Sequence, residues 1–185
     1  RGLGDVYKRQ VMAFIQTHFH NTVTDTVFPI ITSLGEAGIG WIVLSLVLLC
    51  FKKTRRTGGL VLIAMTVTLL FGELTLKNII CRLRPCNVFT DFPMLIARPT
   101  SYSFPSGHTS SSFAAALILT LRHKKVGWLA YIPAVLIAFS RIFLFVHYPT
   151  DVLAGILLGT LAALLTYFAA KAIQKRQAEK RTAQI

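Results

Sequence analysis

The sequence predicts an all-α, polytopic transmembrane helical bundle with about five full spans and a short N-terminal helix. Three observations favour this fold class. Apolar residues make up 54% of the 185 positions and charged residues only 15%, and the mean hydropathy is +0.60. A soluble domain usually contains about 25% charged residues, and a disordered chain has low hydrophobicity. Disorder is therefore excluded, a soluble domain is disfavoured, and the length fits one domain.

The chain is also strongly basic, with 20 Lys and Arg against 7 Asp and Glu and a formal net charge of +13. A basic balance is typical of nucleic-acid-binding proteins, but these carry their charge on a face that water can reach. Long stretches of this chain carry no charge. We therefore expect a lipid bilayer as its surroundings and no nucleic acid as a partner.

The beginning of the chain differs from the rest. Residues 1–10 are out of keeping with the apolar sequence that follows, and we interpret them as a cloning scar or a sequence-assembly artefact. Residues 11–173 then form a single transmembrane domain. Within it, residues 11–20 carry aromatic and aliphatic side chains on one face and are expected to lie at the membrane interface.

A glycine-rich junction follows the apolar run 22–34, with Gly35, Gly38 and Gly40 before the next apolar stretch. The two stretches together are long for one straight span. We expect a short helix, a break at the glycines, and then a crossing helix. The sequence leaves open whether residues 11–34 cross the membrane.

A helix needs about 20 apolar residues to cross the hydrocarbon core. Five stretches reach or approach that length, namely 37–51, 58–80, 107–122, 126–146 and 151–173. The shorter stretch 107–122 follows Pro105-Ser106 and begins with Gly107-His108, so we expect its first turn to be recessed below the surface.

The positive charges predict the orientation. If the five stretches all cross, twelve cations fall on one side, in two short turns and in the basic tail 174–185 with the residues just before it: Lys52, Lys53, Arg55, Arg56, Arg122, Lys124, Lys125, Lys171, Lys175, Arg176, Lys180 and Arg181. The other side receives only Lys77, Arg82, Arg84, Arg98 and Arg141. The positive-inside rule places the first set in the cytoplasm and the long loop 81–106 outside.

Ionisable residues gather at the outer ends of three of these stretches. They are Lys77 and Arg84-Pro85, then Pro105-Ser106-Gly107-His108, then Ser140-Arg141 with His147 and Asp151. The number of crossings places all of them on the same face of the membrane. Ionisable groups near membrane depth are costly and usually functional, so this end is the candidate site.

At these residues the sequence resembles the type 2 phosphatidic acid phosphatase superfamily, which shares its site with vanadium haloperoxidases. The family pattern is Lys, six residues, Arg-Pro; then Pro-Ser-Gly-His; then Ser-Arg, five residues, His, three residues, Asp. The chain matches all three parts in order over roughly residues 60–173. Residues 11–59 match only in hydropathy.

The resemblance implies a reaction through a phosphohistidine. His147 would be the nucleophile, since a neutral imidazole attacks phosphorus when its second nitrogen has an acceptor. Asp151 is placed to be that acceptor. His108 would donate a proton to the leaving oxygen and then activate water.

The phosphate-binding residues implied by the resemblance are Lys77, Arg84, Ser106, Gly107 and Arg141. Phosphoryl transfer places charge on three equatorial oxygens, so fixed cations and donors contribute much of the catalysis. A helix beginning at Gly107 adds a backbone phosphate site. We expect no metal and no other cofactor, because Lys77, Arg84 and Arg141 supply the positive charge that a metal ion would otherwise provide.

The predicted function is an integral membrane lipid phosphatase acting on undecaprenyl diphosphate, phosphatidylglycerophosphate or phosphatidate at the outer face of a bacterial plasma membrane. Two other classes remain open: a vanadium haloperoxidase and a non-catalytic lipid-binding or transport protein. Glu73, one helical turn before Lys77, is expected to pair with it. Arg82 and Arg98 are expected either to attract an anionic headgroup or to be solvated.

Overall fold

The computed structural model describes residues 3–182, which form helices and loops and no strand. The α-helices are α1 (Leu3–His18), α2 (Thr22–Leu34), α3 (Ile39–Cys50), α4 (Arg55–Thr68), α5 (Lys77–Ile80), α6 (Pro85–Val88), α7 (Gly107–Arg122), α8 (Tyr131–Phe143) and α9 (Pro149–Thr182). Short helical segments of other types join some of them: η1 (Glu36–Gly38), the π-helical η2 (Leu69–Leu76) and η3 (Gly127–Ala130). The prediction of an all-α bundle is confirmed.

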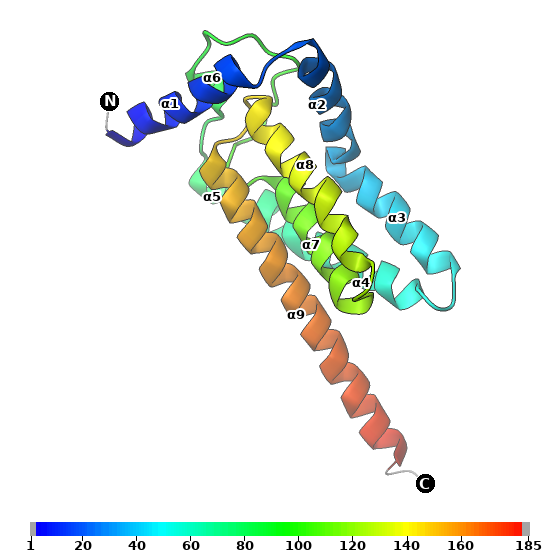
Figure 1. Ribbon diagram of the computed structural model, residues 1–185. Coiled ribbons are helices and arrows are strands. Elements are labelled where there is room, and N and C mark those ends of the chain that lie inside the picture. Colours follow the sequence, from blue (N-terminus) through cyan, green and yellow to red (C-terminus); the bar gives the residue numbers. More distant parts are fainter. Residues whose placement is uncertain (1–2, 183–185) are drawn as a thin grey trace.

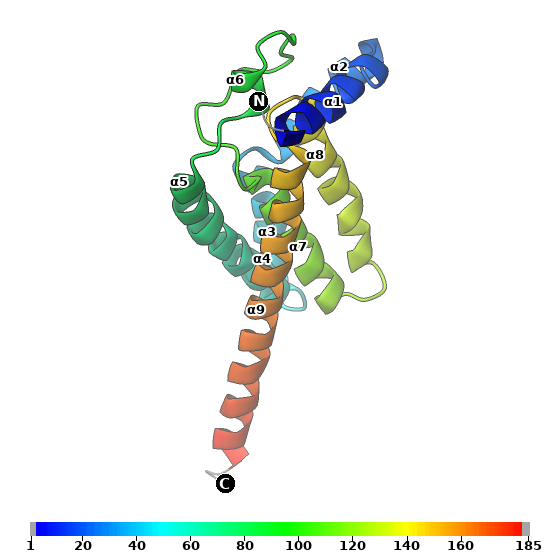
Figure 2. The ribbon, with the colours of Figure 1, turned by 90° about the vertical axis from the view of Figure 1, so that its left-hand side faces the viewer.

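Helix α7 lies at the centre of the bundle, against α9, α4 and α8 (Figures 1 and 2). Small side chains make this close packing possible, and Ala114, Ala115 and Ala116 are fully buried. Apolar side chains on the outward faces are exposed instead, among them Val43, Phe71, Leu157, Leu161 and Leu165. Exposed apolar surface over several helices suits contact with lipid tails rather than with water.

The helices differ in whether their length suits a full membrane span. Two helical stretches within residues 3–182 are long and apolar enough to cross a membrane, Arg55–Val88 and Pro149–Thr182, and a bent pair of helices, α2 with η1 and α3, raises the number to three. Helices α7 and α8 have 16 and 13 residues, fewer than the usual length of a full span. Five full spans therefore stays a prediction.

The glycine break after α2 is confirmed. The chain bends by 44° between Thr22–Leu34 and Glu36–Cys50. Gly38 has a φ of +71° and Ala37 one of +47°, a left-handed conformation that glycine adopts easily and alanine does not. After the bend, α3 runs along the bundle, and Glu36 lies at the same end as the predicted site residues.

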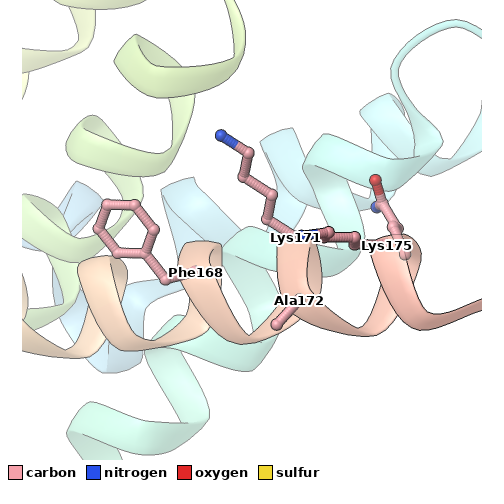
Figure 3. A pocket seen from close by; sticks show the side chains of 5 residues that line it. Phe168, Lys171, Ala172 and Lys175 are labelled. Atoms are coloured by element: carbon pink, nitrogen blue, oxygen red, sulfur yellow. The ribbon is translucent and has the colours of Figure 1, made fainter.

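The two ends of the bundle differ as the charge pattern predicted. The basic turns before α4 and α8 and the basic end of α9 lie at one end, and α1, α5 and α6 lie at the other (Figures 1 and 2). Helix α9 continues to Thr182, so the described part of the basic tail is helical. A shallow hollow on this part of α9, lined by Phe168, Lys171, Ala172, Gln174 and Lys175, includes none of the predicted site residues (Figure 3).

Helix α1 lies across the end opposite the basic turns (Figure 1). Its residues Met12 and Ile15 are buried in a cluster with Phe143 and Phe145. Residues 3–10 are continuous with this helix, and Arg9 forms an ion pair of 2.9 Å with Asp91. The interpretation of residues 1–10 as a scar stays a prediction; residues 1–2 lie outside the described part of the chain.

Two glycines of α9 allow its close contact with α7. A Cβ at Gly155 would lie 2.7 Å from the carbonyl oxygen of Ser106, and one at Gly159 would overlap the carbonyl oxygen of Ser110 and lie 3.0 Å from the amide nitrogen of Ala114. Backbone atoms cannot move aside as a flexible side chain does. The start of α7, and with it Ser106–His108, is thus held against α9.

We expect Gly159→Ala to lower the free energy of unfolding by about 1–3 kcal/mol, since the added methyl group forces α7 and α9 apart. The matched control is Gly59→Ala in α4, where an added Cβ meets no atom within 4 Å and helix propensity favours alanine by about 1 kcal/mol. Thermal unfolding in detergent measures both variants. Equal stability of the two would contradict the proposed packing.

Candidate active site

Arg84 is the residue just before α6 and is held by several hydrogen bonds. Its Nε donates to the carbonyl of Ser101 at 2.7 Å, its Nη2 to the Ser101 hydroxyl at 2.9 Å and its Nη1 to the carbonyl of Val146 at 2.9 Å. The same Nη1 lies 3.1 Å from Nε2 of His147. The guanidinium is 3% exposed, so a buried cation is fixed beside one nitrogen of His147.

The other nitrogen of His147 faces Asp151. Nδ1 lies 3.6 Å from Oδ2 of Asp151 and 3.5 Å from the hydroxyl of Ser103. Ser103 donates to the same Oδ2 at 2.5 Å. A proton on Nδ1 therefore faces a carboxylate, and the lone pair of His147 is left on Nε2, the nitrogen beside Arg84.

His147 lies in the connection between α8 and α9 and is 1% exposed. Burial, together with the charges of Arg84 and Arg141, lowers the pKa of His147 to about 3, although the neighbouring Asp151 carboxylate opposes this shift. Because this value is far below the ordinary pKa of about 6.5, the imidazole is neutral near neutral pH. A neutral imidazole has the lone pair that a nucleophile requires.

The start of α7 brings Ser106, Gly107 and His108 to the same place. The amide of Ser106 donates to the carbonyl of Asp151 at 3.1 Å, which ties this turn to the start of α9. The Nε2 atom of His108 is buried and has no hydrogen-bond partner within the described residues. The nearest carboxylate oxygen is Oε2 of Glu36, at 3.8 Å.

Lys77 is buried at the end of the π-helical segment and pairs with Glu73. Its Nζ donates to both carboxylate oxygens at 2.7 Å, so the predicted pairing is confirmed. A Cβ at Gly107 would overlap Oε1 of Glu73. The pair therefore lies against the first turn of α7, and a larger residue at position 107 would have to displace the Glu73 carboxylate.

Arg141, at the end of α8, is 4% exposed. Its Nη1 donates to the hydroxyl of Thr32 in α2, whereas its Nε is buried with no partner among the described residues. A buried N–H without an acceptor is costly, and an anion entering the site would supply that acceptor.

The predicted residues thus converge at one end of the bundle. Lys77, Arg84 and Arg141 are close enough for their positive charges to repel one another, and the electrostatic environment of His108 includes all three of them and His147. Buried cations that repel one another form a ready binding site for a multiply charged anion.

Several neighbours in this site were not predicted. Ser101, Ser103, Thr32 and Glu36 contact the predicted residues but belong to a loop and to segments with no motif of their own. Arg82 binds Asp151 at 2.6 Å, so neither predicted alternative, solvation or headgroup attraction, describes its contacts. The one sequence signal that could have suggested this contact is the position of Arg82 between Lys77 and Arg84 of the motif.

A metal site was not expected, and the metal-independent reaction stays a prediction. Within residues 3–182, no three His, Cys, Asp or Glu side chains gather as metal ligands. The arrangement brings together a neutral imidazole, a second histidine and three buried cations.

Comparisons with known proteins identify the family. Residues 57–175 match the model of the PAP2 superfamily, and the chain belongs to that superfamily. The matched residues include all eight predicted site residues. The predicted family is thereby confirmed.

Individual relatives carry more specific names. The chain is 39% identical over 127 residues to a protein of Sulfolobus acidocaldarius named undecaprenyl-diphosphatase, covering 68% of this chain and 61% of that protein. It is 33% identical over 145 residues to the bacitracin transport permease protein BcrC of Bacillus licheniformis, covering 77% and 71%. This chain thus spans about three fifths of the length of the first of these relatives.

A solved structure extends the likeness to the whole fold. The crystal structure of a transmembrane PAP2-type phosphatidylglycerolphosphate phosphatase from Bacillus subtilis superposes with a TM-score of 0.75 at 28% identity, covering 94% of this chain and 89% of that chain. The fold is therefore that of an integral membrane phosphatase, and the names of these relatives are consistent with a phosphoric ester hydrolase.

The buried site predicts an unusual titration of His147. Since burial holds its pKa near 3, we expect the imidazole to stay neutral down to about pH 5, well below the ordinary value. Nitrogen-15 NMR of histidine-labelled protein in detergent measures this directly, with His147→Gln to assign the signal. A His147 signal that titrates near the ordinary pKa would contradict the burial described above.

Proposed function

We propose that the protein is a membrane lipid phosphatase that hydrolyses a phosphate or diphosphate headgroup through a phosphohistidine on His147. The observation that carries this proposal is the convergence of three buried cations on two histidines. Lys77, Arg84 and Arg141 are 5%, 3% and 4% exposed. Burying three cations near one another is unfavourable, and a phosphate provides the missing negative charge.

In the first half of the proposed reaction, Nε2 of His147 attacks phosphorus and the bond between phosphorus and the lipid oxygen breaks. His108, in its protonated form, gives its proton to the departing oxygen and becomes neutral. Arg84 lies beside Nε2 and, with Lys77 and Arg141, neutralises the charge on the equatorial oxygens. Ser106 and the backbone amide of Gly107 donate to the same oxygens at the start of α7.

In the second half, His108 takes a proton from water, the resulting hydroxide attacks phosphorus, and the phosphorus–nitrogen bond breaks. Inorganic phosphate leaves and His147 returns to its neutral form. Asp151 holds the Nδ1 proton throughout, so the lone pair always lies on Nε2. No metal enters either half.

The substrate proposed first is a polyprenyl diphosphate such as undecaprenyl diphosphate. Support comes from the name of the Sulfolobus relative and from the exposed apolar faces, which let a tail remain in the bilayer while its headgroup enters the site. The name of the Bacillus subtilis structure makes phosphatidylglycerophosphate the second candidate substrate, and phosphatidate is the third. A side-by-side comparison of rates on the three lipids separates them.

A transport role is the second candidate, because one relative carries the name of a transport permease. A transporter would not require His108, His147 and Asp151 together, whereas a phosphatase does.

A vanadium haloperoxidase would use the same cations to hold vanadate, but the members of that class are generally soluble.

We expect the purified protein in detergent to release inorganic phosphate from undecaprenyl diphosphate with a chelator present, and His147→Ala to abolish the release, because no other group replaces the nucleophile. The matched control is His18→Ala, since His18 is exposed on α1 and should leave the rate unchanged. Full activity in His147→Ala would refute the mechanism, and activity only after metal is added would refute its metal independence.

We also propose that the site faces the outside of the cell. Cys81 is exposed at the site end, next to Arg82, while Lys124 is exposed in the basic turn before α8. In a Cys50→Ser background, we expect an impermeant maleimide to label Cys81 in intact cells. In a Cys50→Ser, Cys81→Ser background, Lys124→Cys should be labelled only after permeabilisation, and the reverse pattern would overturn the orientation.

A further inference from the structure

Arg82 makes more specific contacts than an exposed loop arginine usually does. The two N–H groups of its Nη1 donate to Oδ1 of Asp151 at 2.6 Å and to the hydroxyl of Thr150 at 2.8 Å. Its guanidinium carbon lies 4.1 Å from the ring centroid of Tyr148, a distance typical of cation–π stacking. These contacts fix the guanidinium between the connection that carries His147 and the first turn of α9.

The carboxylate of Asp151 is completely buried and receives donors on both oxygens. Oδ2 accepts from the hydroxyl of Ser103 at 2.5 Å and from the amide of Tyr148 at 2.9 Å. Among the described residues, Arg82 supplies the side-chain donor to Oδ1 and the one cation in direct contact with this carboxylate. A buried carboxylate without such a partner would be strongly disfavoured.

The backbone of Arg82 joins the same assembly. Its carbonyl accepts from the amide of Ser103 at 2.8 Å, so the residue holds both the carboxylate and the loop whose hydroxyl reaches that carboxylate. Arg82 therefore connects three segments that are distant in the sequence: the end of α5, the loop before α7, and the start of α9.

We propose that Arg82 is a positioning residue, which fixes the Asp151 carboxylate and through it the tautomer and orientation of His147. Only the kinetic consequence of this inference rests on the proposed function. Arg82 acts through Asp151 and does not contact the phosphate. A headgroup-attracting role, by contrast, would need a guanidinium free to reach outward, and the Nη1 hydrogens of Arg82 are already used.

The test compares Arg82→Gln with Arg98→Gln, because both remove one positive charge from the outer side. Arg98 is exposed and belongs to no part of the proposed site. For Arg82→Gln we expect kcat to fall on the order of 10- to 100-fold, as small displacements of a reacting group do, with KM within about twofold of wild type. Arg98→Gln should leave kcat unchanged.

A double-mutant cycle identifies the route of the effect. In an Asp151→Asn background, Arg82→Gln should cause no further loss of kcat, because the group through which it acts is already altered. Independent, multiplicative losses would overturn the proposal. So would a rise in KM of similar size in Arg82→Gln and Arg98→Gln, which would indicate attraction of the headgroup instead.

A readout without turnover keeps this inference separate from the proposed function. Nitrogen-15 NMR of His147 should show a single tautomer protonated on Nδ1 in the wild type and in Arg98→Gln, and a mixture in Arg82→Gln and Asp151→Asn. An unchanged tautomer in Arg82→Gln would overturn the positioning role even if the protein releases no phosphate. Loss of activity in His147→Ala tests the phosphatase proposal by itself.

Arg82→Lys is a second variant that keeps the proposal testable if Arg82→Gln fails to fold. Lysine keeps the charge but cannot present two N–H groups from one planar nitrogen while stacking on Tyr148. We expect it to keep the wild-type melting temperature, because the ion pair with Asp151 is retained, and to recover part of the lost kcat. If Arg82→Lys lowers stability and activity together while the His147 tautomer stays single, Arg82 is merely structural and the proposal is wrong.

Discussion

The structure depends on the burial of several charged groups at one end of a small helical bundle. A cation within an apolar environment must be hydrogen-bonded or paired. Arg84 is held by backbone and hydroxyl oxygens, and Lys77 by Glu73. The loops around the site satisfy these charges, whereas Nε of Arg141 and Nε2 of His108 are buried without a hydrogen-bond partner among the described residues.

The close contact of α7 with α9 is what brings the separate parts together. Gly155 and Gly159 let the backbone of α7 approach α9, and the amide of Ser106 then reaches the carbonyl of Asp151. The turn at Gly107 and the histidine–carboxylate pair at the start of α9 thus share one support. A site that must hold reacting groups within a fraction of an ångström needs such support.

The two halves of the site have different physical tasks. His147, Ser103, Asp151 and Arg82 form one chain of contacts, since Nδ1 of His147 lies 3.5 Å from the hydroxyl of Ser103 and both Ser103 and Arg82 donate to the Asp151 carboxylate. The three cations form a separate, electrostatic part, and their mutual repulsion favours an anion beside them. Arg84 contacts both parts, since one of its nitrogens lies beside Nε2 of His147.

The sequence by itself determined the fold class, the break after α2 and the family, because apolar runs, glycines and residue spacing are local properties. It also predicted that the motif side chains from Lys77 to Asp151 gather at one end of the bundle, which is where the structure places them. The tertiary structure alone decided the roles of Ser103, Thr32, Glu36 and Arg82. The hydrogen bonds of Ser103, Arg82 and Thr32 join residues that are 44 to 109 positions apart in the sequence. No local pattern encodes such contacts, because only the packing of the chain brings these segments together.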